Sequence, residues 1–261
     1  MILRIESADN GRLKLMRKLA SRKTREAEGK FVIEGINLVK EAVSRGVDID
    51  FIAVSDGFRD TEFTDECSER GLTVCIVPDS LFAKLTDAVN GVGIAAVVRK
   101  MRYSTNPLSE LPDGVNVVVL DRLQDPGNIG TIVRTAVAAG YGMVIAIRGT
   151  VDVYSPKVLR STAGAIFDIP VIYADNPTEL TDELRNSGRK VIATSPTAER
   201  RYFDEDLSSN VAVVIGNEGN GISAEIRDGS DVLVSIPMKG STESLNAAVS
   251  AALLMYEAAR E

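Results

Sequence analysis

The sequence predicts an α/β protein with two domains: a smaller one over residues 1–98, a linker over 99–114, and a larger doubly wound domain over 115–261. β-type apolar runs alternate with helical patterns along the chain, which is typical of sheets with helices packed on their faces. The polar stretch 99–107 interrupts this alternation and ends in proline. The run 115–120 that follows is almost continuously apolar, as is typical of a strand buried on both faces of a parallel sheet.

The first domain opens with a basic amphipathic pattern. Leu13, Met16 and Leu19 recur at helical spacing, which predicts a helix over 12–27. Short β-type runs with helical patterns between them follow. We expect strands over 31–33, 50–55, 72–77 and 92–98, and helices over 37–44 and 80–88.

The second domain continues the alternation with longer apolar runs. A helix is expected to end at Gly140, because glycine is favoured just past a helix terminus. We expect strands over 115–120, 143–147, 169–173, 190–194, 211–215 and 231–236, and helices over 129–139, 156–165, 178–186 and 244–259.

Composition excludes several classes of site. The 261 residues include no histidine, which removes Ser-His and Cys-His nucleophiles and most zinc centres. Cys67 and Cys75 lack the spacing of metal ligands, so we expect no metal. The chain has no signal-peptide pattern and no apolar run near the about 20 residues that cross a bilayer, so we expect a cytoplasmic protein without a membrane partner.

The net charge of −7 is unevenly distributed. Residues 1–30 hold nine Lys or Arg against four acidic residues, a net +5, which leaves −12 on the rest of the chain. A basic helix on an acidic body can contact RNA phosphates, and it can equally be a solvated helix face. The side chains expected to contact RNA are Arg17, Lys18, Arg22, Lys23 and Arg25.

Three polar segments, over 121–130, 216–221 and 236–246, follow predicted strands of the second domain where each strand gives way to a loop or a helix start. In an open parallel sheet such loops meet at the carboxyl edge, where ligands bind. Asn128 is expected to cap the helix that follows it, and Arg134 to point toward the same mouth. Glu218 adds a carboxylate as a possible partner for Arg134, and Ser241 or Thr242 is expected to cap the last helix.

The glycine spacing of the second loop argues against two nucleotide-binding classes. Its Gly-x-x-Gly-x-Gly order differs from the dinucleotide fingerprint, and it lacks the Lys of a P-loop. A nicotinamide-dependent oxidoreductase is therefore the least favoured alternative. Taken singly, each loop also fits a helix cap or a tight turn, but those explanations do not account for all three loops in this order.

Together the loops resemble the SpoU (TrmH) branch of the SPOUT RNA methyltransferases. The resemblance rests on Asn128-x-Gly130-x-x-x-Arg134, Gly216-Asn217-Glu218-Gly219-x-Gly221, and Ile236-Pro237-Met238 through Ser244-Leu245-Asn246. Residues 31–35 and 41–42, with Arg25, are similar to the substrate-binding domain of the same family. The resemblance implies a C-terminal SPOUT-type α/β domain with a trefoil knot, preceded by a smaller ribosomal-protein-like α/β sandwich.

The resemblance also implies a function. Family members use S-adenosylmethionine to methylate the 2′-hydroxyl of a ribose in RNA, and they work as homodimers through the C-terminal domain. Because the N-terminal domain is present, we expect large-subunit rRNA of the 23S type as the substrate. The same chemistry on tRNA, or a non-catalytic RNA-binding or ribosome-assembly role, are the alternatives.

Residue roles follow from the matched motifs. The side chains expected around the transferred methyl group are Asn128, Arg134, Glu218, Ser244 and Asn246. Cofactor contacts are expected from Gly216, Asn217, Gly219, Gly221, Ile236, Met238 and Leu245. A guanidinium stays protonated above about pH 12, so we expect Arg134 to hold a phosphate and stabilise alkoxide charge, oriented by Glu218, rather than to act as a base.

Overall fold

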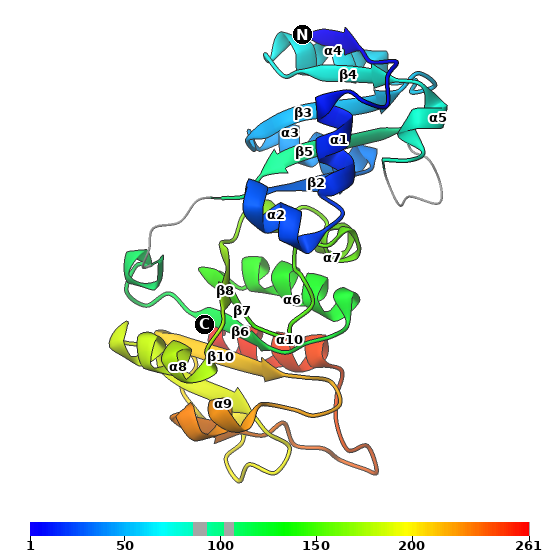
Figure 1. The fold of residues 1–261 in the computed structure, drawn as a ribbon. Helices are drawn as coiled ribbons and strands as arrows, with labels where there is room; N and C mark the ends of the chain where they lie inside the picture. The colour runs from blue at the N-terminus through cyan, green and yellow to red at the C-terminus, as the bar shows by residue number, and fades with distance from the viewer. Residues whose placement is uncertain (86–92, 102–106, 261) are drawn as a thin grey trace. The chain divides into compact units, whose positions relative to one another are not determined.

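The computed structural model describes residues 1–85, 93–101 and 107–260 (Figure 1). The chain divides into two compact units, Met1–Arg102 with Tyr154–Arg160, and Tyr103–Val153 with Ser161–Glu261. The sequence does not indicate that Tyr154–Arg160 groups with the first unit. Residues 86–88 of one expected helix, residue 92 of an expected strand, and residues 102–106 of the expected linker lie outside the described residues.

The first unit is built on a mixed five-stranded sheet in the order β1-β4-β3-β5-β2. β5 pairs antiparallel with β2 and β3, and the other pairs are parallel. The strands are β1 (Ile2–Arg4), β2 (Lys30–Glu34), β3 (Ile49–Ser55), β4 (Val74–Val77) and β5 (Ile94–Arg99). The helices are α1 (Gly11–Lys18), α2 (Arg22–Glu28), α3 (Ile36–Ser44), α4 (Thr61–Glu69) and α5 (Asp79–Phe82).

The expectation of one helix over 12–27 is wrong, because the chain forms α1 and α2 with a break between them. The break is held by the guanidinium of Arg25, whose Nη1 donates to the carbonyls of Leu19 and Ala20 at 2.7 Å each. Carbonyls at a helix end need such partners. The apolar side of α1 does pack as expected, since Leu13 and Met16 join the core of this unit. Strand β1 and helix α4 are not predicted by the sequence patterns.

The second unit contains a six-stranded, fully parallel sheet in the order β11-β9-β10-β6-β7-β8. Its strands are β6 (Val117–Asp121), β7 (Met143–Ile147), β8 (Val171–Ala174), β9 (Lys190–Thr194), β10 (Val211–Gly216) and β11 (Val232–Val234). The helices are α6 (Pro126–Ala138), α8 (Pro177–Asn186), α9 (Ala224–Gly229) and α10 (Ala247–Ala258), whereas most of α7 (Pro156–Thr162) belongs to the segment that groups with the first unit. Short 3-10 turns are η1 (Pro107–Glu110), η2 (Ala165–Phe167) and η3 (Tyr202–Asp204). The six strands were all expected, whereas α9 was not.

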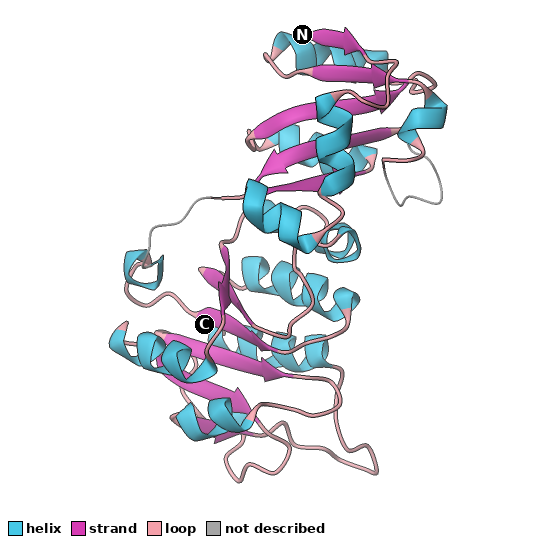
Figure 2. Ribbon diagram, in the orientation of Figure 1, coloured by secondary structure: helices cyan, strands magenta, loops and turns pink. Residues whose placement is uncertain are grey.

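Helices cover both faces of this sheet (Figure 2). Leu180 and Leu184 of α8 and Ile226 of α9 share one core with Val117 and Val119 of β6. Neighbouring side chains of a strand point to opposite faces. The helices α6 and α10 contact each other, and α10 contacts β10, on the other face. The sheet is thus a buried central layer whose carboxyl edge is left to loops.

The strand order produces a crevice at that edge. From β6 the chain adds β7 and β8 on one side, whereas β10 and β9 lie on the other. Ligands bind in open α/β sheets where the strand order reverses in this way, here between β6 and β10. The insertion of β10 between two strands formed earlier is compatible with a trefoil path, and the knot stays a prediction. Within the described ranges, no helix is both long enough and apolar enough to cross a bilayer.

Candidate functional site

A carboxylate with three hydrogen-bond donors lies at the crevice between β6 and β10. Asn128 Nδ2 donates to Glu218 Oε1 at 3.0 Å, and the backbone amides of Asp125 and Gln124 donate to Oε1 and Oε2 at 3.1 Å each. Partial burial alone would raise the pKa of Glu218, but these hydrogen bonds outweigh it and hold the pKa below its usual value. Glu218 is therefore ionised at neutral pH, and it ties the β10 loop to the start of α6.

A second asparagine extends this contact into a chain. Asn246 Nδ2 donates to Asn128 Oδ1 at 2.8 Å. The orientation of both amides follows from the hydrogen bonds themselves, because an ionised carboxylate only accepts. Glu218 must face the NH2 group of Asn128, which turns Asn128 Oδ1 toward Asn246 and leaves Asn246 Oδ1 for the helix. The three sequence motifs thus meet in one directed network.

The helix caps differ from those expected. Asp125, not Asn128, caps α6, since its Oδ1 accepts from the backbone amide of Asn128 at 2.7 Å. Proline at the first position of α6 fits this arrangement, because its missing N–H costs nothing there. Asn246, rather than Ser241 or Thr242, caps α10 by accepting from the amides of residues 248 and 249. Both errors concern which polar residue near the helix start lies at the cap position.

The loop after β10 closes on itself. Asn217 and Gly221 exchange two backbone hydrogen bonds of 2.9 Å, and Asn217 Oδ1 accepts from the amides of Gly219 and Asn220. A Cβ at Gly216 would lie 2.4 Å from the carbonyl carbon of Gly221, which is too close for any side chain. Gly221 has a φ of +68°, which favours glycine. The loop is compact because its glycines permit this approach.

A cavity of about 760 Å³ opens beside this loop. All seven residues expected to contact a cofactor line it: Gly216, Asn217, Gly219, Gly221, Ile236, Met238 and Leu245. Glu218, Ser244 and Asn246 line it as well. Sequence reasoning missed the loop 194–197 and Arg227, which also form its wall. The contribution of the loop after β9 could have been predicted, because this loop leaves the same edge of the sheet as the other loops of the site.

Arg134 lies apart from this network. It is exposed on α6 and makes no hydrogen bond or ion pair with any described residue, and Glu218 contacts Asn128 instead. The expectation that Glu218 orients Arg134 within one chain is therefore wrong. Arg134 follows Asn128 by six residues, which at about 100° each is one full turn and about 240° more. Arg134 therefore projects from a different side of α6 than Asn128. Thr131, three residues on, does share the side of Asn128.

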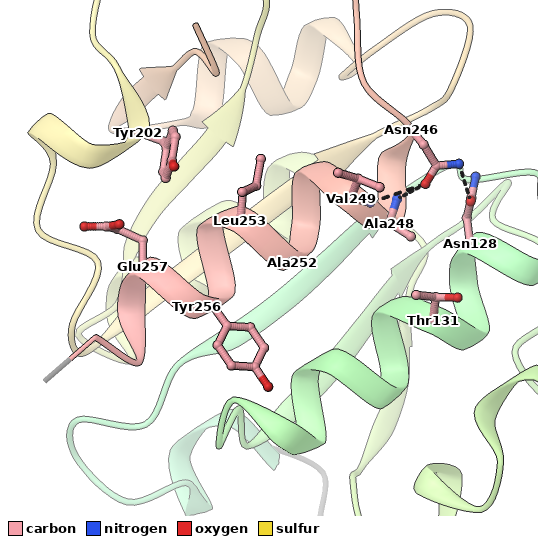
Figure 3. Close-up of a pocket in the computed structure, with 10 residues that line it drawn as sticks. All are labelled: Asn128, Thr131, Tyr202, Asn246, Ala248, Val249, Ala252, Leu253, Tyr256 and Glu257. Carbon is pink, nitrogen blue, oxygen red and sulfur yellow. Dashed lines mark hydrogen bonds between the residues drawn. The ribbon is translucent and has the colours of Figure 1, made fainter.

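A second hollow, of about 530 Å³, adjoins the two asparagines (Figure 3). Its wall is one side of α10, formed by Val249, Ala252, Leu253 and Tyr256 at helical spacing, with Asn128 and Thr131 of α6 at one end. Val249 and Tyr256 are 48% and 54% exposed, which is high for large apolar side chains. This exposed stripe is unusual in a helix that otherwise packs against the sheet.

The basic residues of α1 and α2 differ in their availability. Arg25 is 4% exposed and is bonded to backbone carbonyls, so its expected contact with RNA is replaced by a structural role. Arg17 donates to the carbonyls of Leu13 and Ala8, and Arg22 pairs with Glu26. Lys18 and Lys23 are exposed. The exposed cations of these helices are thus fewer than the sequence alone indicates.

Comparison with known proteins agrees with this geometry. The SpoU rRNA Methylase family matches residues 116–256, and the MRM3-like substrate binding domain matches residues 10–96. The 23S rRNA (guanosine(2553)-2′-O)-methyltransferase RlmP of Bacillus subtilis is 36% identical over 252 residues, which cover 97% of each chain.

Two solved structures are similar over nearly the whole chain. The AdoMet-bound rRNA methyltransferase of Sinorhizobium meliloti has a TM-score of 0.84 at 30% identity, covering 99% of this chain and 98% of that one. The SpoU methyltransferase AviRb of Streptomyces viridochromogenes, in complex with AdoMet, has a TM-score of 0.85 at 31% identity, covering 96% and 97%. With the motif residues gathered at one sheet edge and both units matched, the chain belongs to the SpoU rRNA methylase family.

Proposed function

We propose that this chain catalyses transfer of a methyl group from S-adenosylmethionine to the 2′-hydroxyl of a ribose in large-subunit rRNA. The observation that carries the proposal is the directed network Asn246–Asn128–Glu218 at the rim of the large cavity. The full-length similarity to an rRNA 2′-O-methyltransferase and the match of residues 10–96 to a substrate-binding domain support rRNA over tRNA.

The cavity suits S-adenosylmethionine. Ile222, Ile236 and Leu245 provide apolar surface, and the glycine loop brings backbone amides and carbonyls to the wall without side chains between. A ligand with an apolar-faced base and several polar groups needs this mixture. When bound, the cofactor supplies an electrophilic methyl group on a positively charged sulfur.

The residues of the chain then have to align the ribose. Glu218 is a weak base, because its pKa is lowered and its oxygens already accept three hydrogen bonds. It therefore serves to fix the amide of Asn128, which in turn is fixed by Asn246. Precise alignment of nucleophile and methyl group contributes most where the leaving group needs no acid. Ser244, at the cavity wall, is placed to contact the ribose or the cofactor.

The proposal includes a homodimer through the apolar side of α10. Exposed Val249 and Tyr256, with half-buried Leu253 between them, form an apolar stripe next to Thr131 of α6. A second copy seated there would bury that stripe, as large apolar surface favours. Arg134 is three residues from Thr131, so in the dimer it would reach toward the site of the partner copy. There it would stabilise the developing alkoxide.

Mixed dimers test this arrangement. Arg134→Ala and Glu218→Ala proteins, each inactive alone, are expected to regain part of the activity when they are refolded together, because one site of the mixed dimer then carries both groups. Tyr256→Glu is expected to give a monomer by light scattering. Activity in the Tyr256→Glu monomer would refute the shared site.

The substrate is tested with purified protein and rRNA transcribed in vitro. Calorimetric titration is expected to show saturable binding of S-adenosylmethionine and none of NADH. Labelled methyl groups are then expected on one ribose of the large-subunit transcript. Transfer to tRNA alone would move the proposal to the tRNA alternative, and cofactor binding without any transfer would favour an RNA-binding or assembly role.

RNA binding by the first unit is part of the same proposal. Neutralising Arg17, Lys18, Arg22 and Lys23 together is expected to weaken RNA binding and to flatten its dependence on salt. Unchanged affinity at low salt would show that α1 and α2 present only a solvated face. We place the activity in the cytoplasm, which the two buried, unpaired cysteines Cys67 and Cys75 support.

A further inference from the structure

Arg122 occupies an unusual position at the carboxyl end of β6. Its φ is +59°, in the left-handed region that side chains with a Cβ rarely adopt. Its backbone amide donates to Thr150 Oγ1, and its carbonyl accepts from the side chains of Asn217 and Gln124. The backbone at 122 is therefore fixed by two neighbouring loops and by Gln124 of its own loop, and glycine would adopt this conformation without strain.

The side chain of Arg122 supplies a reason for arginine at this position. Nε donates to Oδ1 of Asp121 at 3.1 Å, and Asp121 is fully buried. The methylene groups lie against Gly149, where an added Cβ would be 3.1 Å from Arg122 Cγ. The side chain is nevertheless 43% exposed. Its Nη1 and Nη2 groups make no hydrogen bond with any described residue, although they carry four of the five N–H donors of a guanidinium.

The acidic groups near this edge are already engaged. Glu218 accepts from Asn128 and two amides, Asp125 accepts from the amide of Asn128, and Asp121 accepts from Ser223 as well as from Arg122. The outer face of the Arg122 guanidinium is therefore not neutralised by a second carboxylate. Such a planar, preorganised group with free donors matches a phosphate.

The position of this group relates it to the site. The 121–125 loop also carries the amides that hold Glu218, and Gln124 joins it to the 148–151 loop through Gly149 O at 2.6 Å. Arg148, in that second loop, is exposed too. Two arginines thus flank the carboxyl edge of β6 and β7, next to the crevice in which the target ribose would lie.

We propose that Arg122 is a positioning residue that binds an RNA backbone phosphate beside the target ribose. The inference rests on the proposed function, since it takes RNA as the substrate. It assigns RNA contact to the catalytic unit itself, in addition to the basic helices of the first unit. The ion pair with Asp121 holds the stem of the side chain, and the Nη groups make the contact.

Glutamine at 122 separates the two parts of this side chain. Glutamine Nε2 is bonded to Cδ, as arginine Nε is. Arg122→Gln can therefore keep the donor to Asp121 while it removes the charged outer groups of the guanidinium. Arg185 offers a matched control. Its Nε donates to Asp231 Oδ1 at 2.8 Å, and its side chain is 39% exposed, but it lies on α8 beside the segment that enters β11.

The experiment measures binding to large-subunit rRNA transcribed in vitro, between about 50 and about 200 mM salt. For Arg122→Gln we expect affinity to fall about fivefold to tenfold at the lower salt, and the slope of log affinity against log salt to become shallower by about 0.7 to 0.9, the value of one phosphate contact. Arg122→Lys should keep most of the slope, because it keeps the charge. Arg185→Gln should match the wild type.

A purely structural role gives a different result. If Arg122 only neutralises Asp121, Arg122→Gln leaves the salt slope unchanged, whatever happens to stability, and this overturns the proposal. An equal change of slope in Arg185→Gln overturns it as well, because the effect is then general. Binding of S-adenosylmethionine, measured for each variant, shows whether the catalytic unit is folded. Failure of the wild type to transfer methyl groups would refute the proposed function, whereas the comparison of slopes concerns RNA contact alone.

Discussion

The loop after β10 depends on a glycine at position 216. Gly216 ends the strand, and a Cβ there would lie 2.4 Å from the carbonyl carbon of Gly221 and 2.5 Å from the nitrogen of Ile222. Both atoms belong to the backbone, so no side-chain rotation relieves the overlap. To reach an ordinary contact, the loop has to open by about 1 Å. Gly216→Ala is therefore expected to deform the wall of the large cavity.

The cost follows from the contacts that hold the loop. Opening by about 1 Å would stretch the two 2.9 Å hydrogen bonds between Asn217 and Gly221 beyond their range. Each is worth about 0.5–1.5 kcal/mol net, which gives a loss of about 1–3 kcal/mol, the usual cost of overpacking. The melting temperature of the catalytic unit should fall by about 2–4 °C per kcal/mol. The affinity for S-adenosylmethionine should fall by at least about tenfold, because the wall itself moves.

Thermal unfolding and calorimetric titration measure these two effects. The same loop offers a matched control in Gly219→Ala, where an added Cβ would meet only Asn217 Oδ1 at an ordinary 3.7 Å. This variant should unfold like the wild type. If Gly216→Ala also behaves like the wild type, the close approach of the two backbone segments does not shape the cofactor site, and the assignment of the cavity fails.

Three further variants test other contacts. Asn246→Asp should keep the cap of α10, since Asp caps a helix as well as Asn, but its carboxylate cannot donate to Asn128. We expect the free energy of unfolding to stay within about 1 kcal/mol of the wild type and turnover to fall at least about tenfold. Normal turnover would argue against the network. Burial raises the pKa of Glu205, but its ion pairs with Lys190 and Arg200 outweigh burial and lower that pKa below its usual value. The ionised carboxylate therefore stabilises the fold at any pH above the usual glutamate pKa. This stabilisation is lost as the pH falls through the lowered pKa. Urea unfolding from about pH 6 to about pH 3 should accordingly be less pH-dependent in Glu205→Gln. Arg189→Met removes a buried guanidinium that donates to three backbone carbonyls, so urea unfolding should show a loss of about 2–4 kcal/mol at unchanged cofactor affinity.

The buried sheet of the catalytic unit could be predicted because its signal is local. Strands β7 and β9 have the expected bounds, since each is a continuous apolar run between polar turns. The sheet edge that carries the site follows from the same reasoning. Strand β1 could not be predicted this way, because its three residues form a strand only by pairing with β4, about 70 residues later.

The break between α1 and α2 shows a second limit. The apolar spacing of Leu13, Met16 and Leu19 extends to the C-cap of α1 without a glycine or proline, so periodicity gives no reason to end the helix there. The reason is a tertiary contact, in which Arg25 takes up the carbonyls of Leu19 and Ala20. Arg25, which we expected to contact RNA, is therefore a buried structural group. Charge locates the cations on these two helices but does not indicate which of them are available.

At the site, the sequence indicated which residues gather but not how they are connected. Asn128 and Glu218 are 90 positions apart, and Asn128 and Asn246 are 118 apart, so no local pattern encodes their hydrogen bonds. The direction of the network adds a physical consequence. Because Asn246 is also the cap of α10, the amide of Asn128 is fixed only when the last helix is in place. The same helix presents the stripe proposed for the dimer, so docking of a second copy would stabilise the helix that orients Asn128.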